Sequence, residues 1–149
     1  MNSNALNKVI ARIEARLAQS PSPAIRFPGL WIDPHGPVAA QSIVPEQFFR
    51  DCLVNLLASP PQKRVVDGDM PGDWGKNSIA YNLLVRYGAA FDHDGDGRIS
   101  CEPRPSGWRE TGTFLKAITM LPFIRSLGCN TIHLLPITSI GQDGNKGDL

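Results

Sequence analysis

The sequence predicts an α/β fold in which two parallel strands are joined through a helix. The first observation is a pair of apolar runs, Ile79–Tyr87 and Thr131–Ile137. Strands that are buried on both faces form continuous apolar runs of this kind. The second is a helical pattern within Thr111 to Leu127, which supplies the crossover that parallel strands need. The third is a mostly helical, proline-rich extension that precedes this unit.

Two helices and an extended segment are expected in that extension. Apolar residues recur at helical spacing over residues 4–18, and a second helix is expected over Val44–Leu57, with Pro45 in its first turn. Five prolines from Pro21 to Pro37 predict an extended segment between the helices, which Trp31 anchors to a neighbouring surface.

The boundary between the two halves of the chain is expected at the turn-rich run Asp67–Gly75. A short strand over Arg64–Val66 precedes it. Residues 1–75 are therefore an N-terminal helical and extended segment, and residues 76–149 begin the α/β unit.

The crossover helix contains a local conflict. Its apolar residues continue at helical spacing to Leu127, and Gly128 suits the left-handed position after the last turn. Pro122 lies inside the pattern, where it removes a backbone hydrogen bond and clashes with the preceding turn. We therefore expect a kink, or a break into two helices, near Met120.

An acidic loop, Phe91–Ser100, follows the first strand. Asp92, Asp94 and Asp96 alternate, and Gly97 permits the sharp turn that brings a backbone carbonyl inward at the seventh position. Hard cations prefer such oxygen ligands. The pattern predicts a site for calcium, or magnesium, with these ligands: Asp92, Asp94, Asp96, the carbonyl of Arg98, Ser100 and Glu102.

The loop differs from a calcium-sensor hand in its frame. Its twelfth position is Pro103 and not a bidentate glutamate, and Glu102 comes one residue early. It also follows a strand and not a helix. The alternative is an acidic, solvated turn that binds no ion. His93 occupies a position whose side chain normally points outward from such a loop.

The order of these segments resembles the start of the alpha-amylase superfamily of glycoside hydrolases. The matching stretches are the strand with its DxDxDG loop (81–97), the helix that ends in Leu127-Gly128, and the strand Leu134-Leu135-Pro136-Ile137. The closing run, 141–149, resembles the loop before that family's substrate-lining tyrosine segment. The resemblance covers about half of the chain.

The resemblance implies the N-terminal part of a TIM (β/α)8 barrel: its first strand, first helix and second strand. It implies a calcium or magnesium ion in the loop, held by Asp92, Asp94, Asp96 and the Arg98 carbonyl. It also implies an alpha-glucan or oligosaccharide substrate. The family's catalytic carboxylates lie on later strands, so no catalytic residue is expected here. We expect a fragment that is inactive alone and exposes the flanks of its strands.

Composition narrows the remaining function classes. A net charge of +1 gives no reason to expect a nucleic-acid partner or an anionic membrane. No apolar run is long enough to span a bilayer, and charged residues interrupt the first twenty positions, so no signal peptide is expected and a cytoplasmic location is predicted. Three unevenly spaced cysteines indicate reduced thiols.

Two alternatives to the enzyme remain open. One is a calcium-binding interaction module in which the DxDxDG loop is the function and no catalysis follows. The other is an inactive relative that keeps the barrel for assembly or transport. His133 is expected to be a core or rim histidine, and packing is the expected role of Tyr87, Arg86 and Trp108, although aromatic faces can also line a sugar cleft.

Overall fold

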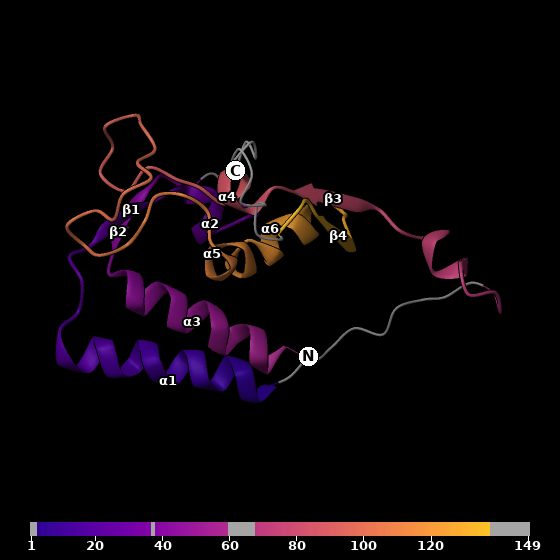
Figure 1. Cartoon of the computed structure of the whole chain (residues 1–149), viewed down its shortest axis with the longest axis horizontal. Helices are drawn as coiled ribbons and strands as arrows, with labels where there is room; N and C mark the ends of the chain where they lie inside the picture. The colour runs from indigo at the N-terminus through magenta and orange to yellow at the C-terminus, as the bar shows by residue number, and fades with distance from the viewer. Residues whose placement is uncertain (1–2, 37, 60–67, 138–149) are drawn as a thin grey trace, which may run out of the picture.

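The computed structural model of the protein describes residues 3–36, 38–59 and 68–137. This part is a mixed α/β domain with two two-stranded sheets, and no barrel is seen in it. Figure 1 shows the elements, in order: α1 (Ser3–Gln19), β1 (Ile25–Phe27), α2 (Gly29–Ile32), β2 (Gln41–Ile43), α3 (Pro45–Ala58), the 3-10 turn η1 (Asp73–Gly75), β3 (Ala80–Leu83), α4 (Val85–Gly88), α5 (Phe114–Thr119), α6 (Leu121–Ser126) and β4 (Thr131–Leu134).

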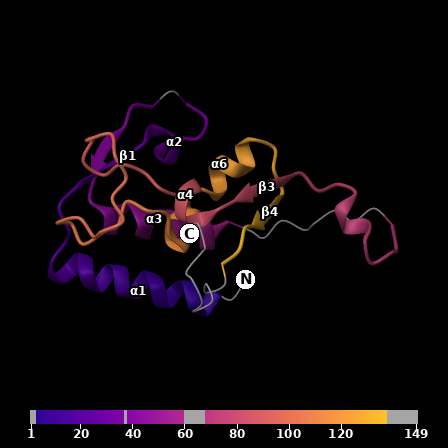
Figure 2. The ribbon, with the colours of Figure 1, turned by 45° about the horizontal axis from the view of Figure 1, so that its top comes forward.

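The two long helices of the first half confirm the sequence prediction. α1 and α3 lie side by side in both ribbon views (Figures 1 and 2). Pro45 is in the first turn of α3, where its missing N–H leaves no helical bond unmade. Their facing apolar stripes provide one wall of the main core.

The segment between these helices is more ordered than predicted. β1 pairs with β2 in an antiparallel ladder, with Ile25 opposite Ile43 and Phe27 opposite Gln41. The proline-rich composition hides these three-residue strands, because neither is long enough to show a period. Trp31 does anchor the segment, since its ring meets the ring of Phe91 at 4.7 Å between centroids.

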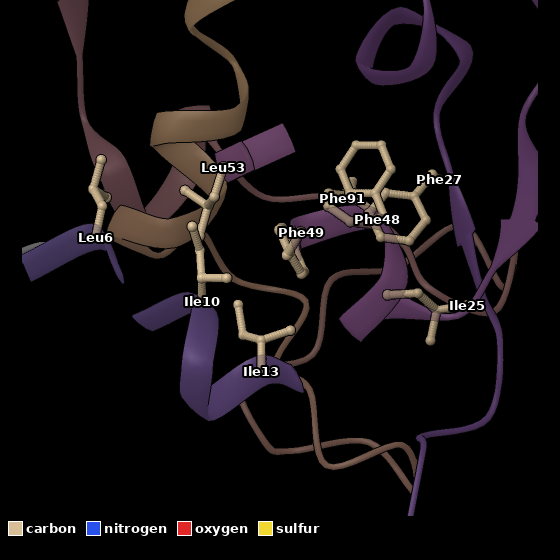
Figure 3. Close-up of a cluster of buried hydrophobic side chains, with 9 residues drawn as sticks. All are labelled: Leu6, Ile10, Ile13, Ile25, Phe27, Phe48, Phe49, Leu53 and Phe91. Carbon is tan, nitrogen blue, oxygen red and sulfur yellow. The ribbon is translucent and has the colours of Figure 1, made fainter. Parts of the chain in front are cut away.

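The main hydrophobic core lies between α1, α3 and β1. Figure 3 shows its side chains pointing toward one another, with Phe27, Phe49 and Leu53 fully buried. Phe91 enters this core from the start of the acidic loop, and its ring lies 5.2 Å from that of Phe27. The loop is therefore fixed to the core at its first residue.

The two strands of the central unit are parallel, as predicted. Ala80 pairs with Thr131 and Leu83 with Leu134 in β3 and β4. Both strands are shorter than the apolar runs suggested, at four residues each. The predicted strand Ile79–Tyr87 is wrong in its second half, because Val85–Gly88 forms the helical turn α4.

The prediction that both strands are buried on both faces is also wrong. Among their residues only Leu83 is fully buried, and Leu134 is 40% exposed. In the described part of the chain β3 and β4 pair only with each other, so their outer edges are unpaired. The flanks of the strands are therefore exposed in the described part of the chain, as predicted.

The crossover helix breaks at the predicted position. α5 ends at Thr119 and α6 begins at Leu121, on either side of Met120, and Pro122 lies in the first turn of α6, where a proline costs no hydrogen bond. Gly128 has a φ of 83°, the left-handed conformation expected after the helix. The two helices cover Leu83 with Ala117, Met120 and Ile124 in a second core.

Some sequence predictions about the fold remain untested by this structure. The strand over Arg64–Val66 and the closing run 141–149 lie outside the described residues. The boundary at residue 75 stays a prediction. Among the described helices, none has the length and apolar character needed to cross a membrane.

Candidate metal centre

The acidic loop is the first part of a long excursion between α4 and α5. Its base is closed by a backbone hydrogen bond from Phe91 to Glu110, at 3.0 Å. Two residues later, the carbonyl of His93 accepts a hydrogen bond from the N–H of Arg26 in β1, at 2.9 Å. These bonds attach the loop to the antiparallel sheet and to the segment that precedes α5.

The three predicted aspartates converge. Asp92, Asp94 and Asp96 each offer a carboxylate oxygen, and these oxygens all lie within 4.8 Å of one another. Asp92 is half-buried, whereas Asp94 and Asp96 are exposed. The group has the oxygen chemistry that a hard divalent cation prefers.

Local hydrogen bonds explain why this sequence forms a tight loop. Asp92 Oδ1 accepts from the N–H of Asp94 and Gly95, and its Oδ2 accepts from that of Gly97. Aspartate side chains commonly stabilise turns by bonding to the backbone two or three residues on. Gly95 and Gly97 have φ of 83° and 78°, a conformation that strains residues with a Cβ.

The same bonds set the charge of the first aspartate. Burial acts to raise the pKa of Asp92, but the N–H groups of Gly97, Gly95 and Asp94 outweigh it and hold the pKa below its ordinary value. Asp92 is therefore ionised at neutral pH.

An arginine that the sequence analysis did not single out lies against the group. Arg104 Nη2 is 3.0 Å from Asp96 Oδ2 and 3.3 Å from Asp94 Oδ2. Its Nε is 3.0 Å from Glu110 Oε1, as an ion pair and not as an aligned hydrogen bond. One guanidinium thus joins two exposed carboxylates to a buried one.

Glu110 contacts the acidic loop through its carboxylate, and its side chain has no exposed surface. Its Oε1 accepts from the N–H of His93 at 3.0 Å, and its Oε2 accepts from that of Ser100 at 2.6 Å. Burial acts to raise the pKa of Glu110, but Arg104 and these two N–H groups together hold it below its ordinary value. The carboxylate therefore fixes both ends of the acidic run.

The outward orientation expected for His93 is wrong. Its side chain is only 4% exposed and packs on Phe91, with its Nε2 3.0 Å from Lys116 Nζ. Burial, and next the charge of Lys116, lower the pKa of His93 to about 4. The imidazole is neutral at pH 7 and turns away from solvent because Phe91 and Lys116 enclose it.

Lys116 is a buried amine in the first turn of α5. Its Nζ donates to the carbonyls of Arg109 and Glu110, at 2.8 Å and 3.0 Å, and lies 4.1 Å from the centre of the Phe91 ring. Burial lowers the pKa of Lys116 to about 7. The lysine joins the helix to the segment that carries Glu110.

Arg98, Ser100 and Glu102, the other predicted ligands, are not part of the converging carboxylate group. The N–H of Arg98 donates to Asp96 Oδ1, and Ser100 Oγ bonds to the backbone of Glu102. The exposed carboxylate of Glu102 is not in the converging group of described residues. The roles of Arg98, Ser100 and Glu102 as ligands stay predictions.

Trp108 packs rather than lining a cleft, as expected. Its ring stacks on Phe49 at 4.9 Å, and its Nε1 donates to Ser22 Oγ. Glu46, which is fully buried, accepts from Ser22 and pairs with Arg16 Nε at 2.8 Å. This cluster attaches the end of the excursion to α1 and α3.

The remaining candidates are His133, Tyr87 and Arg86. His133 in β4 is exposed and its Nδ1 lies 2.8 Å from Asn82 Oδ1 in β3, so it is a rim and not a core histidine. Tyr87 is 61% exposed, and the Arg86 guanidinium approaches the sulfur of Cys101.

Comparison of the chain with models of known families, and with curated proteins, gave no match. The functional assignment therefore depends on the order of the motifs and on the geometry described above.

The sequence offered little signal for the residues that organise the loop. Arg104 lies between two prolines, and Glu110 lies in an irregular run before α5, where no period shows which side chains are buried. One signal was present in the sequence. Lys116 lies in a helix whose apolar residues predict packing against a core, and a lysine there could have drawn attention to this network.

Proposed function

We propose that this chain is the N-terminal part of an alpha-amylase-like glycoside hydrolase that acts on alpha-linked glucans. In this proposal β3, the acidic loop, α5–α6 and β4 are the first strand, first loop, first helix and second strand of a (β/α)8 barrel. The catalytic carboxylates belong to later strands.

One observation carries the proposal: β3 and β4 are parallel and are joined through the acidic loop and a broken helix. Parallel sheets occur almost always with both faces covered and with several strands. Here the outer edges of the pair are unpaired among the described residues, and Ile79 and Ile137 beside the strands are each 58% exposed. Further parallel strands would cover these surfaces.

The acidic loop is better suited to support than to catalysis. A retaining glycosidase needs one carboxylic acid with a raised pKa, about 5–5.5 Å from a carboxylate nucleophile. Asp92 has a lowered pKa and both of its oxygens accept backbone hydrogen bonds. The proposal therefore assigns no residue of this chain to acid or nucleophile.

The donor set fits calcium or magnesium in its chemistry. Three carboxylates converge, and the outer oxygens of Asp94 and Asp96 point to the same guanidinium nitrogen of Arg104. When bound, the ion would neutralise the aspartates and hold their carboxylates together, as a structural and not a catalytic group. The residues that would hold it are Asp92, Asp94 and Asp96.

The proposal is tested by expressing the complete open reading frame that encodes this chain. The purified product is incubated with starch and maltodextrins, and reducing ends are measured over time. Cellulose serves as a matched glucan with the opposite anomeric linkage. Release from starch and not from cellulose supports the proposal, whereas a folded product that releases nothing from either contradicts it.

The calcium-binding interaction module is the second candidate, and the converging aspartates favour it equally. The two candidates differ in what surrounds β3 and β4. A reading frame that encodes further strands with acidic residues at their ends favours the enzyme. A stable, monomeric 149-residue product that binds calcium favours the module.

A further inference from the structure

One positive side chain of the protein, Arg104, already faces two of the three aspartates. Arg104 Nη2 lies 3.0 Å from Asp96 and 3.3 Å from Asp94, with each distance measured to the Oδ2 atom. The opposite oxygens, Oδ1 of both residues, accept backbone N–H groups within the loop. The Oδ2 atoms of Asp94 and Asp96, which are the oxygens left for a shared cation, are therefore the two that Arg104 contacts.

A divalent cation and this guanidinium compete for the same place. Calcium lies about 2.3–2.6 Å from its oxygen ligands, so an ion on Asp94 Oδ2 and Asp96 Oδ2 would occupy the region that Nη2 takes. Two positive centres at that separation repel each other strongly. The ion can bind these oxygens only if Arg104 leaves them.

Arg104 is also paired with a third carboxylate, that of Glu110. Its Nε is paired with Glu110, which has no exposed surface and is fixed by the N–H groups of His93 and Ser100. Its side chain is only 25% exposed. Moving the guanidinium therefore disturbs a buried carboxylate, unlike moving a free surface arginine.

We propose that Arg104 is an internal counter-ion that takes the place of a divalent cation in the acidic loop and weakens cation binding there. The inference rests on the proposed cation-binding role of this loop and specifies how that role is regulated. The loop keeps its shape without an ion, and an ion binds only by displacing Arg104.

The test is a calcium titration by calorimetry of the 149-residue chain at constant ionic strength, with three proteins. These are the unchanged chain, Arg104→Gln and Arg109→Gln. Arg109 is an exposed arginine of the same excursion between α4 and α5 and is not among the predicted ligands, so its removal changes the net charge equally without opening the carboxylates. We expect Arg104→Gln to bind Ca²⁺ at least tenfold more tightly, and Arg109→Gln to stay within about twofold of the unchanged chain.

Equal or weaker binding by Arg104→Gln overturns the inference, as does an equal gain in both variants. Circular dichroism checks that each variant is folded. If Arg104→Gln is unfolded, the paired change Arg104→Gln with Glu110→Gln removes both partners of the ion pair together, so that no buried carboxylate is left without its counter-ion. The same tenfold gain is expected of it relative to Glu110→Gln alone.

The outcome is separable from that of the proposed function. A calcium titration that fails leaves the sugar-release assay unaffected. Conversely, a reading frame whose product cleaves no glucan counts against the enzyme, while the titration still decides the role of Arg104.

Discussion

Glu110→Gln tests whether the buried carboxylate holds the acidic loop. Glu110 Oε1 and Oε2 accept from the N–H groups of His93 and Ser100, and Oε1 also faces Arg104. Glutamine keeps the shape but only one acceptor oxygen, so one N–H loses its partner and the ion pair is lost. A hydrogen bond to a charged group contributes about 1.5–3 kcal/mol.

Arg104, the ion-pair partner of Glu110, is a quarter exposed and can still pair with Asp94 and Asp96. Solvent and these two carboxylates therefore reduce the free-energy cost of losing the Arg104–Glu110 pair. We expect Glu110→Gln to lower the free energy of unfolding by about 2–3 kcal/mol, a large share of what a small domain has. Urea unfolding followed by circular dichroism measures it. Glu102→Gln, an exposed acid of the same excursion, is the control and should change stability by less than about 0.5 kcal/mol. Equal effects of both substitutions would refute a supporting role for Glu110.

Two further predictions concern the main hydrophobic core and the buried lysine, Lys116. Phe49→Ala removes a fully buried ring and should cost about 3–5 kcal/mol in urea unfolding, whereas the half-exposed Phe114→Ala should cost less than about 1 kcal/mol; similar losses would place the core elsewhere. Burial lowers the pKa of Lys116 to about 7 from 10.5, so above pH 7 the unfolded chain binds more protons and stability rises with pH. Between pH 7 and 9 the gain should be about 1–2 kcal/mol and absent in Lys116→Met, and a flat profile in the unchanged chain contradicts it.

The parts of the fold that are periodic could be predicted from sequence. α1 and α3 show apolar stripes over several turns, and the break at Met120 follows from the geometry of Pro122 alone. The parallel pairing of β3 and β4 was predicted because a helix lies between two apolar runs.

Other parts depend on contacts that no local pattern encodes. β1 and β2 are three residues each and are defined by pairing with one another across the chain. The strand prediction failed after Leu83 because Val85–Gly88 forms a single helical turn, from which Val85 packs into the second core. Apolar composition alone does not separate these two conformations.

In the candidate site, too, local features could be predicted from the sequence and longer-range contacts could not. The convergence of the three aspartates follows from their spacing and from the glycines, which are local features. The inward position of His93, and the contacts of Arg104 and Glu110, depend on residues 6 to 23 positions away. Sequence reasoning therefore identified the three converging aspartates and missed the residues that hold them in place.

The account depends most directly on the parallel pairing of β3 with β4. Nuclear Overhauser contacts in the isotopically labelled chain measure it without any substitution. We expect cross-strand contacts between Ala80 and Thr131 and between Leu83 and Leu134. Contacts of Ala80 with Leu134 and of Leu83 with Thr131 would mean an antiparallel pair, which could not begin a (β/α)8 barrel.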